Sequence, residues 1–176
     1  MTLLTPKEGI VYLFDIAAKY RTADAKNNPG KSEEYFSHLE QLVKSVERPS
    51  FDQHLPEFHK TLNMALEDRK QFNQSRRTQV VLISALTGLT FAAASYFAVP
   101  HSQPLAVAAG IISGVNLVTG GIFLSKSNAY TLVQDDAMKA TQTTTHVTWK
   151  HVVNKHEMRL RGQIDRYHRA LNKQHA

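Results

Sequence analysis

The sequence predicts an all-α protein: a two-span transmembrane helical hairpin with amphipathic helical arms before and after it. Three observations lead to this prediction. Residues 78–125 form a run of 48 positions without a single Lys, Arg, Asp or Glu. Two parts of that run, 78–99 and 105–124, contain 22 and 20 residues. Each would cross roughly 30 Å of hydrocarbon as a helix that rises about 1.5 Å per residue. The flanking segments are polar and repeat their apolar residues with the period of a helix.

These observations divide the 176 residues into three parts. Residues 1–77 are expected to form an amphipathic arm of about three helices. Residues 78–125 are the apolar hairpin, with a turn at 100–104, and residues 126–176 are a basic amphipathic arm. No cleavable signal is expected at the N-terminus, because the apolar run there is short, is interrupted by Asp15 and follows no basic segment.

The N-terminal arm begins with a clear helix start signal. Thr5 is followed by a proline and, three residues after the threonine, by a glutamate, which is the pattern of a capping box. This first helix should run to about Arg21. Ser32 is expected to cap a second helix and Ser50 a third. Because no breaker occurs before Pro100, the third helix is free to continue into the first apolar segment.

The apolar hairpin carries small residues at the spacing of a helix face. Pro100 and Pro104 bracket the turn, since each lacks an amide hydrogen and disfavours helix in the residue before it. Small side chains let two helices approach closely. We expect the two segments, or two copies of the chain, to pack through these residues: Ser84, Gly88, Ala92, Ala106, Gly110 and Gly114.

Charged residues beside the hairpin predict its orientation in a membrane. Arg76 and Arg77 precede the first apolar segment, Lys126 follows the second, and the turn has no charge. We expect these three side chains to face lipid headgroups. Cytoplasmic loops carry the excess of Lys and Arg, so both termini should be cytoplasmic.

The C-terminal arm should bend near 141–147, where three threonines in a row favour helix poorly. A long amphipathic helix is expected over 149–171, with an interaction stripe that packs on the N-terminal helices or on another copy. A homo-oligomer or a helical protein partner is therefore expected. The stripe contains Trp149, Val153, Leu160, Ile164, Tyr167 and Leu171.

The positive charge of the chain is concentrated in this arm. Residues 126–176 contain nine Lys or Arg against four Asp or Glu, while the whole chain has a formal net charge of +6. A solvated helix face that reinforces topology explains the excess most simply, and attraction to anionic lipid is a second explanation. Nucleic acid ranks below both, because the aromatic residues lie on the packing stripe and not among the basic ones.

No pattern in the sequence indicates an enzyme. The chain has no phosphate-binding glycine loop and no nucleophile elbow, and the two apolar segments of its hairpin contain no carboxylate or histidine. Zero cysteines exclude thiolate chemistry and disulfides. His54 and His59, like His151 and His156, are five residues apart and do not share a helix face, so neither a metal site nor a cofactor is expected.

Three functions from different classes remain open. The first is an integral two-span protein that acts as a scaffold, effector or assembly subunit through cytoplasmic helical arms, and we favour it. The second is a pore-forming or membrane-inserting protein whose arms sheathe the hairpin in a soluble state. This layout resembles, in architecture alone, the hydrophobic hairpin of pore-forming colicin domains. The third is a soluble helical interaction domain with the hairpin as its buried core. Its weakness is size, because one small domain would have to cover two fully apolar helices on every side.

Overall fold

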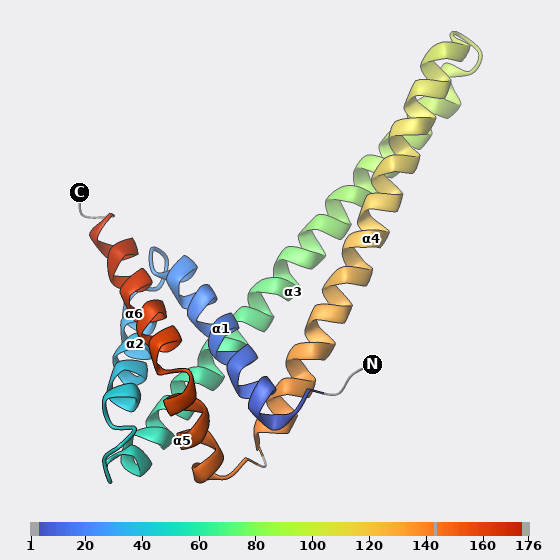
Figure 1. Ribbon diagram of the computed structural model, residues 1–176. Helices are drawn as coiled ribbons and strands as arrows, with labels where there is room; N and C mark the ends of the chain where they lie inside the picture. Colours follow the sequence, from blue (N-terminus) through green and yellow to red (C-terminus); the bar gives the residue numbers. More distant parts are fainter. Residues whose placement is uncertain (1–3, 143, 174–176) are drawn as a thin grey trace. The chain divides into compact units, whose positions relative to one another are not determined.

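The computed structural model describes residues 4–142 and 144–173, with the backbone but not the side chains of 126–130. In this part of the chain the protein is all-helical, as predicted, and contains no strand. Two helices are long and apolar enough to cross a membrane. The helices, shown in Figure 1, are α1 (Pro6–Asp24), α2 (Pro29–Lys44), α3 (Phe51–Ala98), α4 (Gln103–Gln142), α5 (His146–Lys155) and α6 (Glu157–Asn172).

The contacts divide the chain into two compact units. One unit, which we call the helical unit, contains residues 1–69 and 133–176; the other, the hairpin unit, contains residues 70–132. Helices α3 and α4 contribute to both units, because each helix continues past the end of the charge-free run. The hairpin unit therefore extends beyond residues 78–125 on both sides.

The first helix begins as the sequence predicts. The Thr5 hydroxyl accepts a hydrogen bond from the Glu8 backbone amide at 3.4 Å, and the Glu8 carboxylate accepts one from the Thr5 amide at 2.9 Å. These reciprocal bonds satisfy two amides that the first turn would otherwise leave unpaired. The helix ends at Asp24, three residues after the expected end.

The second helix begins earlier than the sequence suggests, and the prediction that Ser32 caps it is wrong. Asn28 occupies the N-cap position and Pro29 begins the helix. Pro29 suits this place because its fixed φ is helical and its missing amide hydrogen would have had no partner there. Ser32 lies within α2, is buried, and donates its hydroxyl to the Arg21 carbonyl at 2.9 Å.

The expected continuity and the expected break are both confirmed. Helix α3 runs unbroken through Pro56 into the apolar segment, and α4 ends at Gln142 before α5 begins at His146. The single helix expected over 149–171 is wrong in one respect. His156, with φ −110° and ψ 15°, separates α5 from α6.

The core of the helical unit is aromatic. The Phe14 ring lies 5.4 Å from that of Phe58 and 5.9 Å from that of Trp149, the latter at 88°. Phe36 and Tyr167 stack at 4.1 Å and 16°. Each fully buried large apolar side chain contributes on the order of 1.5–3 kcal/mol relative to exposure. These contacts join α1, α2 and α3 to the two C-terminal helices.

The helical unit also contains a charged network around a buried arginine. Arg21 is 1% exposed and donates to an Asp68 oxygen at 2.9 Å, with Asp24 at 3.5 Å. Lys31 reaches the same Asp68 oxygen at 3.0 Å. The network links α1, α2 and α3. A buried guanidinium needs such partners, because an unpaired charge is costly to remove from water.

Candidate membrane-interaction site

The hairpin unit contains two apolar helical segments joined by a four-residue connection, 99–102. The amides of His101 and Ser102 both donate to the Ala98 carbonyl, at 3.0 and 2.8 Å, which pairs backbone groups at the end of α3. Pro104 is the second residue of α4, where its missing amide hydrogen costs no helical bond. The turn therefore ends before the predicted boundary at 104.

Small residues and two hydroxyls form the contact between the segments. Ser113 donates its hydroxyl to the Gly88 carbonyl at 2.8 Å, and Ser95 donates to the Ala106 carbonyl at 2.6 Å. A Cβ on Gly88 would lie 3.0 Å from the Leu117 side chain. Side-chain to backbone bonds between helices satisfy hydroxyls that hydrocarbon could not.

The six expected packing residues are not all buried between the two segments. Gly88 and Ala106 are buried and Ser84 is half-buried, with a Cβ on Gly120 3.1 Å from the Ser84 Cβ. A Cβ on Gly110 would lie 3.5 Å from the Ser95 hydroxyl. Ala92 is exposed, as is Gly114, which meets nothing within 4 Å.

The difference arises from the helical period. Successive steps of four residues advance by about 40° beyond a full turn, so a series such as 106, 110 and 114 leaves the contact face. The buried positions of α4 instead alternate steps of three and four, which keeps them on one face. Sequence reasoning missed three of them, although this alternation was a usable signal: Ala109, Ser113 and Gly120.

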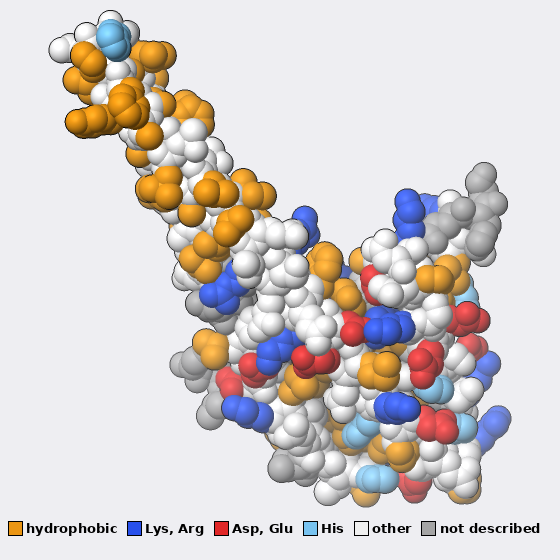
Figure 2. Space-filling model, turned by 180° about the vertical axis from the view of Figure 1, so that it is seen from behind, with side chains coloured by type: hydrophobic (Ala, Val, Ile, Leu, Met, Phe, Trp, Pro, Cys, Tyr) orange, Lys and Arg blue, Asp and Glu red, His pale blue; other side chains and the backbone are white. Residues whose placement is uncertain are grey.

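The outer surface of the hairpin unit is apolar and exposed. Of the most apolar 18-residue windows in the two helices, 6% and 17% of residues are buried. Tyr96 and Phe97, next to the turn, are 77% and 71% exposed. Figure 2 shows hydrophobic side chains distributed along this unit. The larger of them include Leu82, Ile83, Leu86, Leu89, Val107, Ile111, Val115 and Val118.

The expected headgroup-facing residues lie at the end of the apolar segments opposite the turn. Arg76 is exposed, with its guanidinium carbon 6.0 Å from the centre of the Phe72 ring one turn earlier, and Arg77 is half-buried. The side chain of Lys126 lies outside the described residues. Between Arg77 and Ala98 the helix α3 rises roughly 30 Å, at about 1.5 Å per residue, which matches the thickness of a hydrocarbon core.

The interaction stripe of the C-terminal arm is used inside the helical unit. Five of its six members are buried in the core, and Leu171 packs against the core while partly exposed. The stripe therefore packs on the N-terminal helices, one of the two outcomes that its pattern allowed, and these side chains are not open to another copy. The five are Trp149, Val153, Leu160, Ile164 and Tyr167.

The histidine pairs singled out in the sequence do not come together as metal ligands. Among the described residues, no group of three or more His, Cys, Asp or Glu side chains could hold a metal ion. His59 instead contacts Trp149, with ring centres 4.3 Å apart. Burial lowers the pKa of His59, and the positive charge of His146 lowers it further.

Comparisons with known proteins identify no relative. No protein-family model matches the sequence, and the chain has no significant match among curated proteins or solved structures. The functional interpretation therefore rests on the chain's own sequence and structure.

Proposed function

We propose that this protein is an integral membrane protein whose hairpin unit spans the bilayer twice. The observation that supports this proposal is the exposure of the apolar segments. A core helix would be covered by its own protein, whereas at least four-fifths of the most apolar windows are uncovered. Lipid is the solvent in which such a surface is stable, since a helix satisfies its own backbone there. In this proposal the two spans form a helical hairpin with amphipathic helical arms before and after it.

The charge pattern supports an orientation with both termini in the cytoplasm. Arg76 and Arg77 flank the first segment at the end opposite the turn, and the turn residues carry no Lys or Arg. Positive residues next to a span are retained on the cytoplasmic side. The helical unit would then be cytoplasmic and the turn would lie on the opposite side of the membrane.

We further propose that the helical unit acts without catalysis, as a scaffold, effector or assembly subunit. The residues of its interaction stripe pack into its own core. Docking of a helical partner or a second copy would therefore use the polar surface of the helical unit or the exposed face of the hairpin unit. Contact with anionic lipid is consistent with the basic C-terminal arm, and a role in nucleic-acid binding is not favoured.

The first experiment tests insertion. Membranes from cells that express the full chain are washed with alkaline carbonate, and the protein should stay in the pellet. Recovery in the supernatant, as a monodisperse protein, would instead support the soluble interaction domain or the sheathed membrane-inserting form. Leakage from dye-loaded liposomes at neutral and acidic pH then separates these two, because only the inserting form opens them.

The second experiment tests orientation. Because the sequence contains no cysteine, an introduced cysteine is the single thiol of the protein that can react. Single variants Ser102→Cys, in the turn, and Ser50→Cys, before α3, are exposed to a membrane-impermeant maleimide in intact cells. Ser102→Cys should react at once, and Ser50→Cys only after permeabilisation. The opposite result would reverse the proposed topology, while reaction of both without permeabilisation would contradict a cytoplasmic helical unit.

A further inference from the structure

A groove runs along α1 on the surface of the helical unit. Two neighbouring cavities, of about 410 and 570 Å³, form it and share Asp15 as a lining residue. The smaller lies between α1 and α5, and the larger between α1 and α6. Cavities of several hundred cubic ångströms are of the size that small ligands occupy.

The groove is lined by more cations than acids. Five Lys or Arg side chains contribute to the two cavities, against two carboxylates, and two histidines lie among them. Since walls of protein focus the field of clustered charges, the groove should attract anions. The cations are Lys7, Lys19, Lys155, Arg159 and Arg166; the carboxylates are Glu8 and Asp15; the histidines are His151 and His156.

Within the larger cavity, the one acid is already satisfied. Asp15 forms an ion pair with Arg159 through one oxygen and accepts a hydrogen bond from the Gln163 amide through the other, at 2.8 Å. Gln163 is buried, which fixes this pair of contacts between α1 and α6. Asp15 therefore neutralises Arg159 and leaves the charges of the two other cations of this cavity unpaired with it.

The two remaining cations lie in the same cavity, one on each helix. Lys19 follows Asp15 by one turn of α1, and Arg166 comes from α6. Arg166 donates its Nε to the Gly162 carbonyl at 3.0 Å. Among the described residues, neither side chain forms an ion pair with a carboxylate. An exposed ammonium and an exposed guanidinium thus line one cavity with no acid paired to either.

We propose that this end of the groove binds the phosphate group of an anionic ligand, supplied either by a lipid headgroup or by a soluble phosphate ester. A guanidinium presents parallel donors that match phosphate oxygens, and a lysine adds a compact charge. The Thr22 hydroxyl, which donates to the Ala18 carbonyl at 2.8 Å, also lines the cavity and can accept a hydrogen bond from a hydroxyl of such a ligand. The site goes beyond the proposed membrane insertion and does not depend on it.

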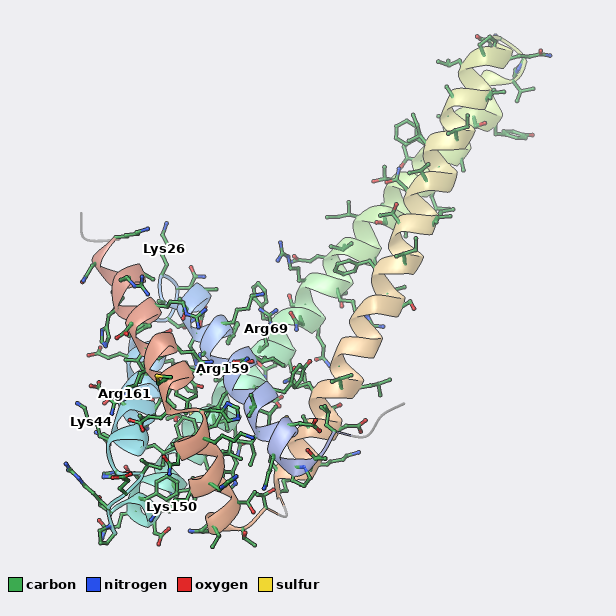
Figure 3. All side chains as sticks on the ribbon, viewed as in Figure 1. Lys26, Lys44, Arg69, Lys150, Arg159 and Arg161 are labelled. Atoms are coloured by element: carbon green, nitrogen blue, oxygen red, sulfur yellow. The ribbon has the colours of Figure 1, made fainter. Side chains whose placement is uncertain are left out.

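The test uses the full chain in a neutral detergent, so that binding is measured without a bilayer. Native mass spectrometry counts bound short-chain phosphatidic acid against phosphatidylcholine, and calorimetry measures binding of glycerol 3-phosphate. The test variant is Lys19→Gln with Arg166→Gln. The control, Lys44→Gln with Arg161→Gln, also removes one Lys and one Arg. Figure 3 shows Arg159 on the side of α6 next to α1 and Arg161 on the side next to α2, the helix that ends with Lys44.

Phosphatidic acid should bind in preference to phosphatidylcholine, and its affinity should fall at least tenfold in the test variant and less than twofold in the control. Binding of the lipid alone assigns the site to a headgroup, and equal loss of glycerol 3-phosphate binding assigns it to phosphate esters in general. Lys19→Arg with Arg166→Lys keeps both charges and should retain binding within threefold. Failure of both probes to bind, or equal weakening of binding in the control variant, overturns the proposal.

Discussion

His59 and Trp149 form a contact that can be followed directly, because Trp149 is the only tryptophan in the chain. Burial, and then the charge of His146, hold the pKa of His59 below its ordinary 6.5. His146 itself lies 3.4 Å from Asp52. The folded protein therefore favours neutral His59 at neutral pH.

We expect Trp149 fluorescence to fall on acidification below pH 6.5, since a protonated imidazole quenches a neighbouring indole. An unfolded histidine takes up its proton at a higher pH than folded His59 does, so the free energy of unfolding should also fall as pH drops through this range. A fluorescence titration checks this. His59→Gln should flatten the step, whereas His54→Gln should leave it, and a step that survives His59→Gln would assign it to another group.

Asp68 is the residue that lets Arg21 be buried. Burial raises the pKa of Asp68, but hydrogen bonds from Lys31 and Arg21 outweigh this effect and lower the pKa below its ordinary 3.8. The stabilisation from Asp68 is thus fully present above the ordinary pKa, which the unfolded chain has. It is lost as the pH falls through the lower pKa of Asp68 in the folded protein.

Asp68→Asn should lower the free energy of unfolding by about 1–3 kcal/mol, because it removes the charge nearest to a buried guanidinium while Asp24 stays. Chemical denaturation at neutral pH measures this loss. Asp165→Asn, at an exposed site on α6, should change stability by less than about 0.5 kcal/mol. Equal effects of the two substitutions would show that the network does not stabilise the fold.

At the scale of elements, the hairpin offers two glycines with opposite surroundings. A Cβ on Gly88 would lie 3.0 Å from Leu117, while a Cβ on Gly114 would meet nothing within 4 Å. Gly88→Leu should lower the stability of the helix pair by about 1–3 kcal/mol through overpacking, and Gly114→Leu should not.

Thermal unfolding in detergent, followed by circular dichroism, compares the two variants. Equal melting temperatures would contradict the contact between the segments. The same samples give oligomer size by chromatography with light scattering. A smaller oligomer for Gly114→Leu alone would place Gly114 between copies, which is the other packing that its sequence pattern allowed.

The sequence predicts helices better than it predicts which of their faces meet. The charge-free run and the capping box at Thr5 are local signals, and both apolar helices and the first helix follow from them. Ser32 was misassigned because its hydroxyl bonds to Arg21, a partner on another helix. The expected series through Ala92 and Gly114 differs from the buried face because a helix face depends on the phase of its partner. Lys19 and Arg166 belong to separate helices, so no local pattern could pair them.

At the scale of the whole molecule, exposure of an apolar residue has a different meaning in each unit. Val115 is 60% exposed in the hairpin unit, and Val147 is 78% exposed in the helical unit. If the hairpin lies in lipid, an arginine at Val115 must enter hydrocarbon, at a cost of about 2.5–3.5 kcal/mol on insertion scales, whereas one at Val147 stays in water.

Val115→Arg should therefore reduce the fraction of protein that resists carbonate extraction, and Val147→Arg should leave it unchanged. Quantitative immunoblotting of the pellet and supernatant gives both fractions. Full retention of Val115→Arg in the pellet would mean that this position does not face hydrocarbon.

The helical unit is assembled from the two ends of the chain, and this has a consequence for biosynthesis. Phe36 stacks on Tyr167, and Phe14 packs on Trp149, so the ribosome must complete the hairpin before either partner exists. Until then, the aromatic faces of α1, α2 and the start of α3 have nothing from the C-terminal helices to cover them. Core closure must follow synthesis of both apolar segments. If the hairpin unit spans a membrane, as proposed, both spans are synthesised before the helical unit can complete its core.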